Sequence, residues 1–162
     1  MILKNKGLYL ESVINYTLEK YSNDSLAYFY KIPLNSTLIS VDNNILKSKL
    51  TKNVFCDYIG IYKGAYIEFE AKETELDYFN LSNIKKSQFE KLEIVSKNSG
   101  VSFIVVYFHK YDKYYGLSWS SLLNFNTKKI SFDWFERNGF EIFFDGRSLG
   151  LIDFINHLIN CI

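Results

Sequence analysis

Several residue types are scarce in this chain of 162 residues, and each scarcity removes a class of protein. The two cysteines, Cys56 and Cys161, form no CxxC pair, which argues against a disulfide framework and a cysteine-based zinc site. The longest apolar run, residues 103–108, is far too short to cross a bilayer. The N-terminus also lacks the apolar segment and cleavage site of a signal peptide. We therefore expect a protein of the reducing cytoplasm with no membrane partner.

Positive charge is also scarce, because the formal net charge is only +1. Many nucleic-acid-binding domains are far more basic, so the overall charge gives no support to DNA binding. A neutral total can nevertheless hide a basic face opposite an acidic one. Arg137 and Arg147 are the only arginines, so contacts to phosphate would rely on lysine, which acts as a point charge.

Apolar residues are abundant, at 48% of the chain, and 18% of residues are aromatic, which is enough for a folded core. Helical spacing predicts helices over three segments, residues 8–21, 83–97 and 151–159, the second capped by Ser82 or Asn83. Strand patterns cover residues 27–32, 54–62, 65–73, 102–109, 114–119 and an edge strand at 140–145. Residues 120–139 are poorly patterned. The order predicts a single α/β domain, 1–162, with a mixed central sheet flanked by helices.

Residues 34–53 differ in kind from the rest of the chain. They are rich in Asn, Ser, Thr and Lys, and their apolar residues are scattered. A connection of this length inside a small domain is usually functional or disordered. We interpret it as an arm, an extended hairpin that leaves the core.

The residues best suited to catalysis lie in the hairpin predicted for residues 54–62 and 65–73. If Lys63-Gly64 is a two-residue turn, Asp57 lies opposite Glu70, with Cβ atoms about 4.5–5.5 Å apart. Alternation then places Glu68, Glu70 and Lys72 on one face, and Ile67, Phe69 and Ala71 on the other, toward a core.

Two opposed carboxylates repel each other, and a divalent cation is the natural compensation. Mg²⁺ prefers one or two carboxylates together with water and phosphate oxygens. Lys72 adds a positive charge that can hold the scissile phosphate, stabilise its developing charge or help to deprotonate water. The alternative is an ordinary solvated strand face, because acidic residues are common there and a β-bulge would shift the register.

The run from Asp57 to Thr74, DYIGIYKGAYIEFEAKET, resembles the central motif of RecU-type Holliday junction resolvases in the PD-(D/E)xK nuclease superfamily. Shorter similarities occur at residues 5–11, 83–88 and 149–155. The resemblance implies a restriction-endonuclease-like fold in which residues 34–53 form a stalk between the first two core strands. It also implies a homodimer that cuts four-way DNA junctions in recombination and repair. Mg²⁺ would be the cofactor, Mn²⁺ a possible substitute, and a recombinase a possible further partner.

The resemblance also assigns roles to individual residues. Asp57, Glu70 and Gln88 would be metal ligands, Lys72 would stabilise the transition state, and Glu11 would be an N-terminal acidic residue of the catalytic set. The residues themselves leave alternatives open. Gln88 falls in an otherwise apolar stripe and needs a polar partner, which a backbone group can also provide. A residue such as Glu11 more often belongs to a solvated helix face.

Candidate contacts to DNA phosphate are the lysines of the N-terminus, the arm and one helix start, namely Lys4, Lys6, Lys47, Lys49, Lys52, Lys85 and Lys86. The chain also departs from the family pattern. Phe55 and Cys56 stand where the family has threonines, one of which contributes to its metal site, and Lys6 replaces an arginine. Metal choice and the salt dependence of junction binding are therefore expected to differ.

Two other functions compete with a junction-resolving nuclease. The first is a non-catalytic junction-binding protein that regulates strand exchange, which the missing threonine favours and the intact Asp57, Glu70 and Lys72 oppose. The second is another PD-(D/E)xK nuclease that cuts ordinary duplex DNA.

Overall fold

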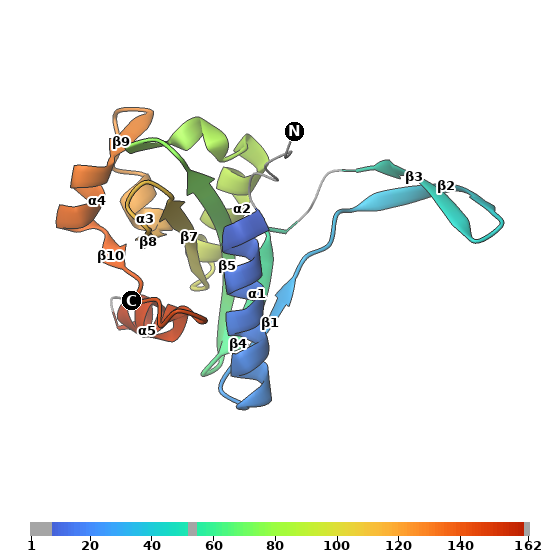
Figure 1. Cartoon of the computed structure of the whole chain (residues 1–162), viewed down its shortest axis with the longest axis horizontal. Coiled ribbons are helices and arrows are strands. Elements are labelled where there is room, and N and C mark those ends of the chain that lie inside the picture. The colour runs from blue at the N-terminus through green and yellow to red at the C-terminus, as the bar shows by residue number, and fades with distance from the viewer. Residues whose placement is uncertain (1–7, 52–54, 161–162) are drawn as a thin grey trace.

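A mixed six-stranded sheet forms the centre of the structure, a computed structural model that describes residues 8–51 and 55–160 (Figure 1). Across the sheet the strands lie in the order β1 (Tyr28–Lys31), β4 (Tyr58–Tyr62), β5 (Ala65–Thr74), β7 (Val101–Phe108), β8 (Lys113–Ser118) and β10 (Phe140–Glu141). Only β5 and β7 pair in parallel. Parallel neighbours need a long crossover connection, and α2 (Lys86–Lys97) supplies it here.

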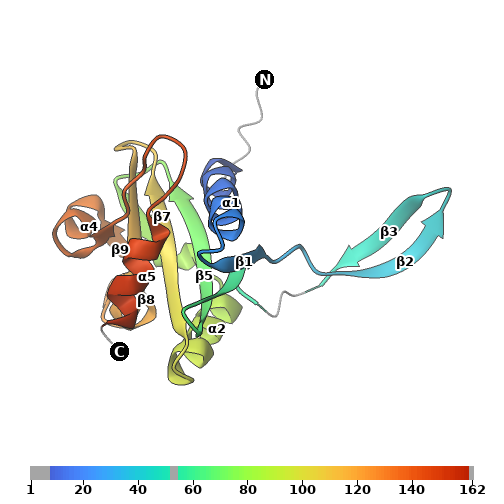
Figure 2. The same cartoon turned by 90° about the horizontal axis from the view of Figure 1, so that it is seen from below.

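Helices cover both faces of this sheet, as the two perpendicular views show (Figures 1 and 2). One face packs against α1 (Leu8–Asn23) and α5 (Leu151–Ile159). The other packs against α2, α3 (Trp119–Leu122) and α4 (Phe132–Asn138). On the first face Phe69 stacks between Tyr58 and Phe103, with ring centroids 4.8 Å apart in both pairs. The predicted α/β fold with a mixed sheet between helices is therefore confirmed.

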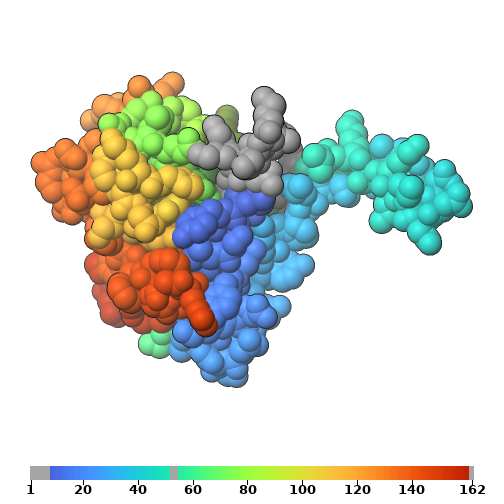
Figure 3. Space-filling model, viewed as in Figure 1, coloured from blue at the N-terminus to red at the C-terminus, as the bar shows by residue number. Residues whose placement is uncertain are grey.

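The arm is a two-stranded hairpin, β2 (Ser36–Asp42) and β3 (Ile45–Leu50), and it projects from the body between β1 and β4 (Figure 3). Every residue of both strands is exposed. The prediction of a protruding stalk between the first two core strands is thus confirmed.

One predicted helix boundary was wrong, and several short elements were not predicted. The helix expected from Asn83 begins at Lys86, because a 3-10 turn, η1 (Leu81–Asn83), precedes it and the Asn80 side chain accepts a hydrogen bond from Ser82 N. The poorly patterned residues 120–139 contain most of α3, all of α4, and β9 (Lys129–Ser131), which pairs with β6 (Tyr78–Asn80). These elements are too short for a periodic signal. Their visible signals are Ser118 and Ser131, whose hydroxyls cap α3 and α4.

Gly116 of β8 faces the Phe154 ring of α5. A Cβ atom at this position would lie 2.2 Å from the Phe154 ring. We expect Gly116→Ala to lower the free energy of unfolding by about 1–3 kcal/mol through overpacking. Chemical denaturation should show this loss, whereas Ser87→Ala on the exposed face of α2 should change stability little. Equal stability of the two variants would contradict the packing described here.

Candidate active site

The β4–β5 hairpin brings the predicted acidic residues together. Lys63 and Gly64 both have positive φ, 48° and 80°, as a tight two-residue turn requires. The register pairs Tyr58 with Phe69 and Tyr62 with Ala65, so the predicted register is confirmed. Asp57 comes directly before β4 and therefore lies beside Glu70.

Asp57 is held by hydrogen bonds around it and not by the strand ladder alone. Its Oδ2 accepts a bond from Ala71 N at 3.3 Å, and its carbonyl oxygen accepts one from Ile32 N at 2.8 Å. The preceding residue is also fixed, because Cys56 N donates to Glu68 Oε2 at 3.0 Å. Glu68 is buried on the Glu70 side of β5, and sequence reasoning gave it no role. Its position on the same alternating face was the available signal.

Lys72 bridges the two carboxylates. Its Nζ lies 2.8 Å from Glu70 Oε2 and 3.6 Å from Asp57 Oδ2. Burial by itself lowers the pKa of Lys72, but the Glu70 and Asp57 carboxylates outweigh it and hold the pKa above its usual value. The amine is therefore a fixed positive charge at neutral pH and not a base.

Glu70 is the most unusual group in the site. Its side chain has no exposed surface, and Oε1 has no hydrogen-bond partner. Burial, followed by the neighbouring Asp57 carboxylate, raises its pKa from 4.5 to about 8, although Lys72 opposes the rise. A buried polar atom without a partner is costly and calls for an explanation. An unpaired carboxylate oxygen beside a second carboxylate is a donor set that suits a hard divalent cation.

Gln88 of α2 reaches the same carboxylate. Its Nε2 donates to Glu70 Oε2 at 2.5 Å, and its Oε1 accepts a bond from Lys85 N at 2.9 Å. The polar partner that the sequence required is thus both Glu70 and a backbone amide. In this arrangement Gln88 directs its nitrogen toward Glu70, so it orients the carboxylate.

Glu11 is not brought to this cluster. It forms an ion pair with Lys31 and lies on α1, which covers the other face of the sheet. Tyr58 senses both Glu11 and the cluster, because its pKa is raised by burial and by the negative charges of Glu11 and Asp57. Within residues 8–51 and 55–160, no three His, Cys, Asp or Glu side chains form a metal-binding group. The site accordingly offers two acidic residues to a metal.

Glu73, which follows Lys72 on the opposite face of β5, is a residue that sequence reasoning missed. Its Oε1 accepts a hydrogen bond from Leu10 N at 2.7 Å, in the first turn of α1. Its Oε2 lies 2.6 Å from His109 Nε2 at the end of β7. The carboxylate therefore accepts a hydrogen bond from the first turn of α1, as a capping side chain does.

We expect Glu73→Ala to lower the free energy of unfolding by about 0.5–2 kcal/mol, because the first turn of α1 loses its acceptor. Thermal denaturation together with amide hydrogen exchange should locate the loss at the start of α1. Exchange that stays unchanged at residues 8–12 would contradict the capping role.

The predicted DNA-binding lysines fall into three groups. Lys47 and Lys49 lie on exposed β3 of the arm. Lys85 is the N-cap residue of α2, and Lys86 forms a solvent-exposed pair with Glu90 at 3.7 Å. Lys4, Lys6 and Lys52 lie outside the described residues.

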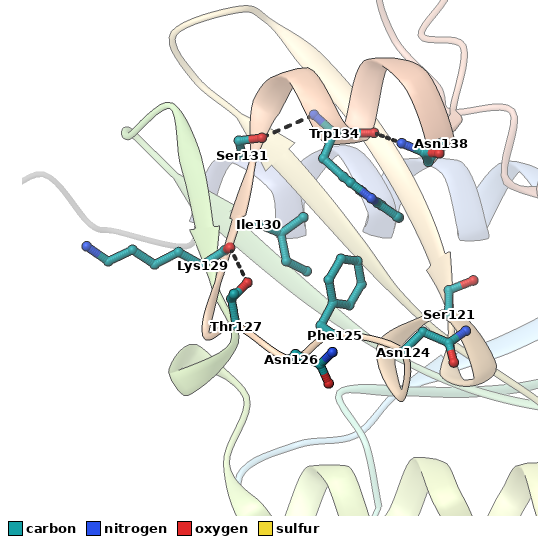
Figure 4. A pocket seen from close by; sticks show the side chains of 10 residues that line it. All are labelled: Ser121, Asn124, Phe125, Asn126, Thr127, Lys129, Ile130, Ser131, Trp134 and Asn138. Atoms are coloured by element: carbon teal, nitrogen blue, oxygen red, sulfur yellow. Dashed lines mark hydrogen bonds between the residues drawn. The ribbon is translucent and has the colours of Figure 1, made fainter.

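A separate hollow of about 470 Å³ lies between α3, β9 and α4 (Figure 4). None of its ten labelled lining residues is acidic. Phe125 and Trp134 meet edge to face there, and Ser131 and Asn138 are bonded to the backbone of Trp134. It therefore offers no carboxylate to a metal, unlike the Asp57–Glu70–Lys72 cluster.

Comparison with known proteins decides the family. The sequence model of recombination protein U, RecU, matches residues 5–160. The chain belongs to the RecU family. It is 36% identical over 155 residues to a RecU of Mycoplasmopsis pulmonis named as a Holliday junction resolvase, covering 96% of this chain and 94% of that protein. A RecU of the same description from Ureaplasma parvum is 33% identical over 143 residues, or 86% of this chain and 84% of the relative.

A solved structure shows the same fold at low sequence similarity. Hjc of Archaeoglobus fulgidus, described as a Holliday junction resolvase, superposes with a TM-score of 0.53 at 12% identity. The match covers 83% of this RecU-family chain and 95% of Hjc. In the described part of the chain, no helix is long and apolar enough to cross a membrane.

Proposed function

We propose that this RecU-family chain is a structure-selective endonuclease that resolves four-way DNA junctions by Mg²⁺-dependent phosphodiester hydrolysis in recombination and repair. The observation that carries the proposal is the buried, unpartnered oxygen of Glu70 beside Asp57 and Lys72. Membership of a family whose relatives are named Holliday junction resolvases supports the choice of substrate. We expect the activity in the cytoplasm, and a recombinase partner stays a prediction.

Asp57 and Glu70 would hold the cation, with Mn²⁺ as a possible substitute for Mg²⁺. When bound, such an ion polarises phosphate oxygens and lowers the pKa of water. Gln88 keeps the Glu70 carboxylate oriented through the 2.5 Å bond to Oε2, which leaves Oε1 free for the ion. Glu68 fixes the backbone before Asp57, so it sets the separation of the two acidic residues.

Lys72 would stabilise the charge that develops on the scissile phosphate. Its raised pKa means that the amine stays protonated while the phosphate is attacked. Of the three roles open to it from the sequence, the geometry therefore favours holding the phosphate and stabilising its charge. Burial strengthens that electrostatic effect, because few waters screen the ammonium group.

We also propose that the protein acts as a homodimer, because symmetric resolution of a junction needs two active sites. The arm supports this. Its pairing puts the side chains of Leu38, Val41, Leu46 and Leu50 on one face, and each of these residues is 57–68% exposed. An isolated two-stranded hairpin is marginally stable in water. A second copy that covers this apolar face would stabilise it, and Lys47 and Lys49 on the other face would meet DNA.

The substrate proposal is tested by incubating a mobile four-way junction and a linear duplex with the protein in Mg²⁺. We expect paired cuts in junction strands and little cutting of the duplex. Equal cutting of both would favour an ordinary duplex nuclease. Tight junction binding with no cleavage in Mg²⁺ or Mn²⁺ would favour the non-catalytic alternative and overturn the enzyme.

The dimer proposal is tested by light scattering on Leu46→Lys and Lys47→Glu, adjacent residues on opposite faces of β3. We expect the first variant to dissociate and the second to stay dimeric but bind junctions more weakly. A wild-type protein that is monomeric at micromolar concentration would contradict the proposal.

A further inference from the structure

A hollow of about 520 Å³ lies next to the candidate active site, between the start of β5 and the C-terminal half of α2. Its walls include Phe55, Tyr66, Glu68, Lys91, Ile94 and Val95. Glu68 lies two residues from Glu70 on the same face of β5, and Lys91 lies one helical turn beyond Gln88. The hollow therefore adjoins the groups that would hold the metal.

Phe55 forms one wall of this hollow. It precedes Asp57 by two residues, so the two Cα atoms are at most about 7 Å apart. The residue is 42% exposed and belongs to neither of the two core clusters of the described structure. The described partner of its ring is Lys91, whose Nζ lies 5.8 Å from the ring centroid. A large part of the ring surface thus stays in contact with water and is available to a ligand.

The polar groups of the hollow restrict what it can receive. Both oxygens of Glu68 are occupied, one by Tyr66 Oη at 2.5 Å and one by Cys56 N at 3.0 Å. The carboxylate is therefore engaged by two donors of the protein and holds the segment before β4. Lys91 contributes a charge with donors only. A half-exposed aromatic ring beside a donor suits a flat group with acceptors on its edge, and every nucleobase is such a group.

We propose that this hollow receives one nucleobase of the strand being cut, next to the scissile phosphate, stacked on Phe55 with its edge toward Lys91. The inference rests on the proposed nuclease function and adds a specificity site to it. Stacking tolerates any base, whereas an ammonium group favours the adjacent acceptors of guanine, O6 and N7. Phe55 would thus hold the base, and Lys91 would select it.

The test compares cleavage rates on junctions that carry each of the four bases on either side of the scissile phosphate. We expect the wild-type protein to prefer one base at one of these two positions. Phe55→Ala should cut the preferred junction roughly 5- to 150-fold more slowly, the range expected for loss of one stacked base. Phe55→Trp should restore the rate, and Lys91→Met should flatten the preference. Phe143→Ala, another exposed phenylalanine at 72%, should behave as wild type.

A second readout does not depend on cleavage. A fluorescent purine analogue at the same position should lose emission when the wild-type protein binds the junction, and keep it with Phe55→Ala. A Phe55→Ala variant with the wild-type rates and the wild-type quenching would overturn the inference while leaving the nuclease intact. A wild-type protein that cuts no junction would instead refute the proposed function, and the quenching would still decide whether the base is bound.

Discussion

Lys72→Met is expected to slow junction cleavage by about 100- to 1000-fold, the usual cost of removing one preorganised group that stabilises transition-state charge. The methionine side chain keeps much of the volume of lysine but cannot neutralise the scissile phosphate. The amine lies 2.8 Å from Glu70 and 3.6 Å from Asp57, so its charge is fixed in the site and poorly replaced by solvent. The measurement is the single-turnover rate on a mobile junction in Mg²⁺.

Junction affinity in EDTA serves as the control for this variant, and it should change little. Lys97→Met is a matched substitution, because Lys97 lies on the exposed face of α2 and pairs with Glu93 at 2.7 Å. It should cut at the wild-type rate. A Lys72→Met protein that cuts within threefold of wild type would show that the amine plays no part in the chemistry.

Glu70 makes the stability of the metal-free protein depend on pH. Its pKa is about 8 in the folded chain, above the ordinary 4.5, so the folded state binds a proton that the unfolded state has released. Proton binding to Glu70 therefore stabilises the folded state. This contribution to the free energy of unfolding is fully present below pH 4.5 and is lost as pH rises through about 8. Within this window the slope is at most about 1.4 kcal/mol per pH unit.

Mg²⁺ is expected to reverse this trend. A cation and a proton compete for the Glu70 carboxylate, so the apparent affinity rises by at most about tenfold per pH unit up to about pH 8 and then levels. Thermal denaturation from pH 5 to pH 9, with and without Mg²⁺, measures both effects. Glu70→Gln should remove the pH slope and the Mg²⁺ response together and lower cleavage at least 1000-fold, as an order-of-magnitude expectation. A Gln variant that keeps the Mg²⁺ response would place the ion elsewhere.

The geometry of the site was predictable where local pattern decides it. The turn at Lys63-Gly64 and strict alternation along β5 were sufficient to bring Asp57 and Glu70 together. Because Gln88 lies in the apolar stripe of α2, the sequence correctly predicted a polar partner for it, although the helix began three residues later than expected. Strands and helices with a regular period were found for the same reason.

Long-range contacts were not predictable, because no pattern along the chain encodes them. Glu73 caps a helix that precedes it by 63 residues, and Glu68 fixes the segment before β4 from the neighbouring strand. The burial of Glu70 also depends on α2, whose Gln88 contacts the Glu70 carboxylate from across the sheet face. Helices as short as α3, with four residues, make too few turns to show a hydrophobic periodicity in the sequence.

The most direct test of the central claim is the rate of junction cleavage by the wild-type chain and by Asp57→Asn, each with Mg²⁺ and with EDTA. The substitution keeps the size of the side chain and the acceptor for Ala71 N while it removes one of the two negative charges offered to the ion. The wild-type protein should cut only with Mg²⁺, and Asp57→Asn should be inactive under both conditions although it folds and binds the junction. Cleavage by Asp57→Asn at the wild-type rate, or cleavage by the wild-type chain in EDTA, would contradict a metal-dependent centre built on Asp57, Glu70 and Lys72.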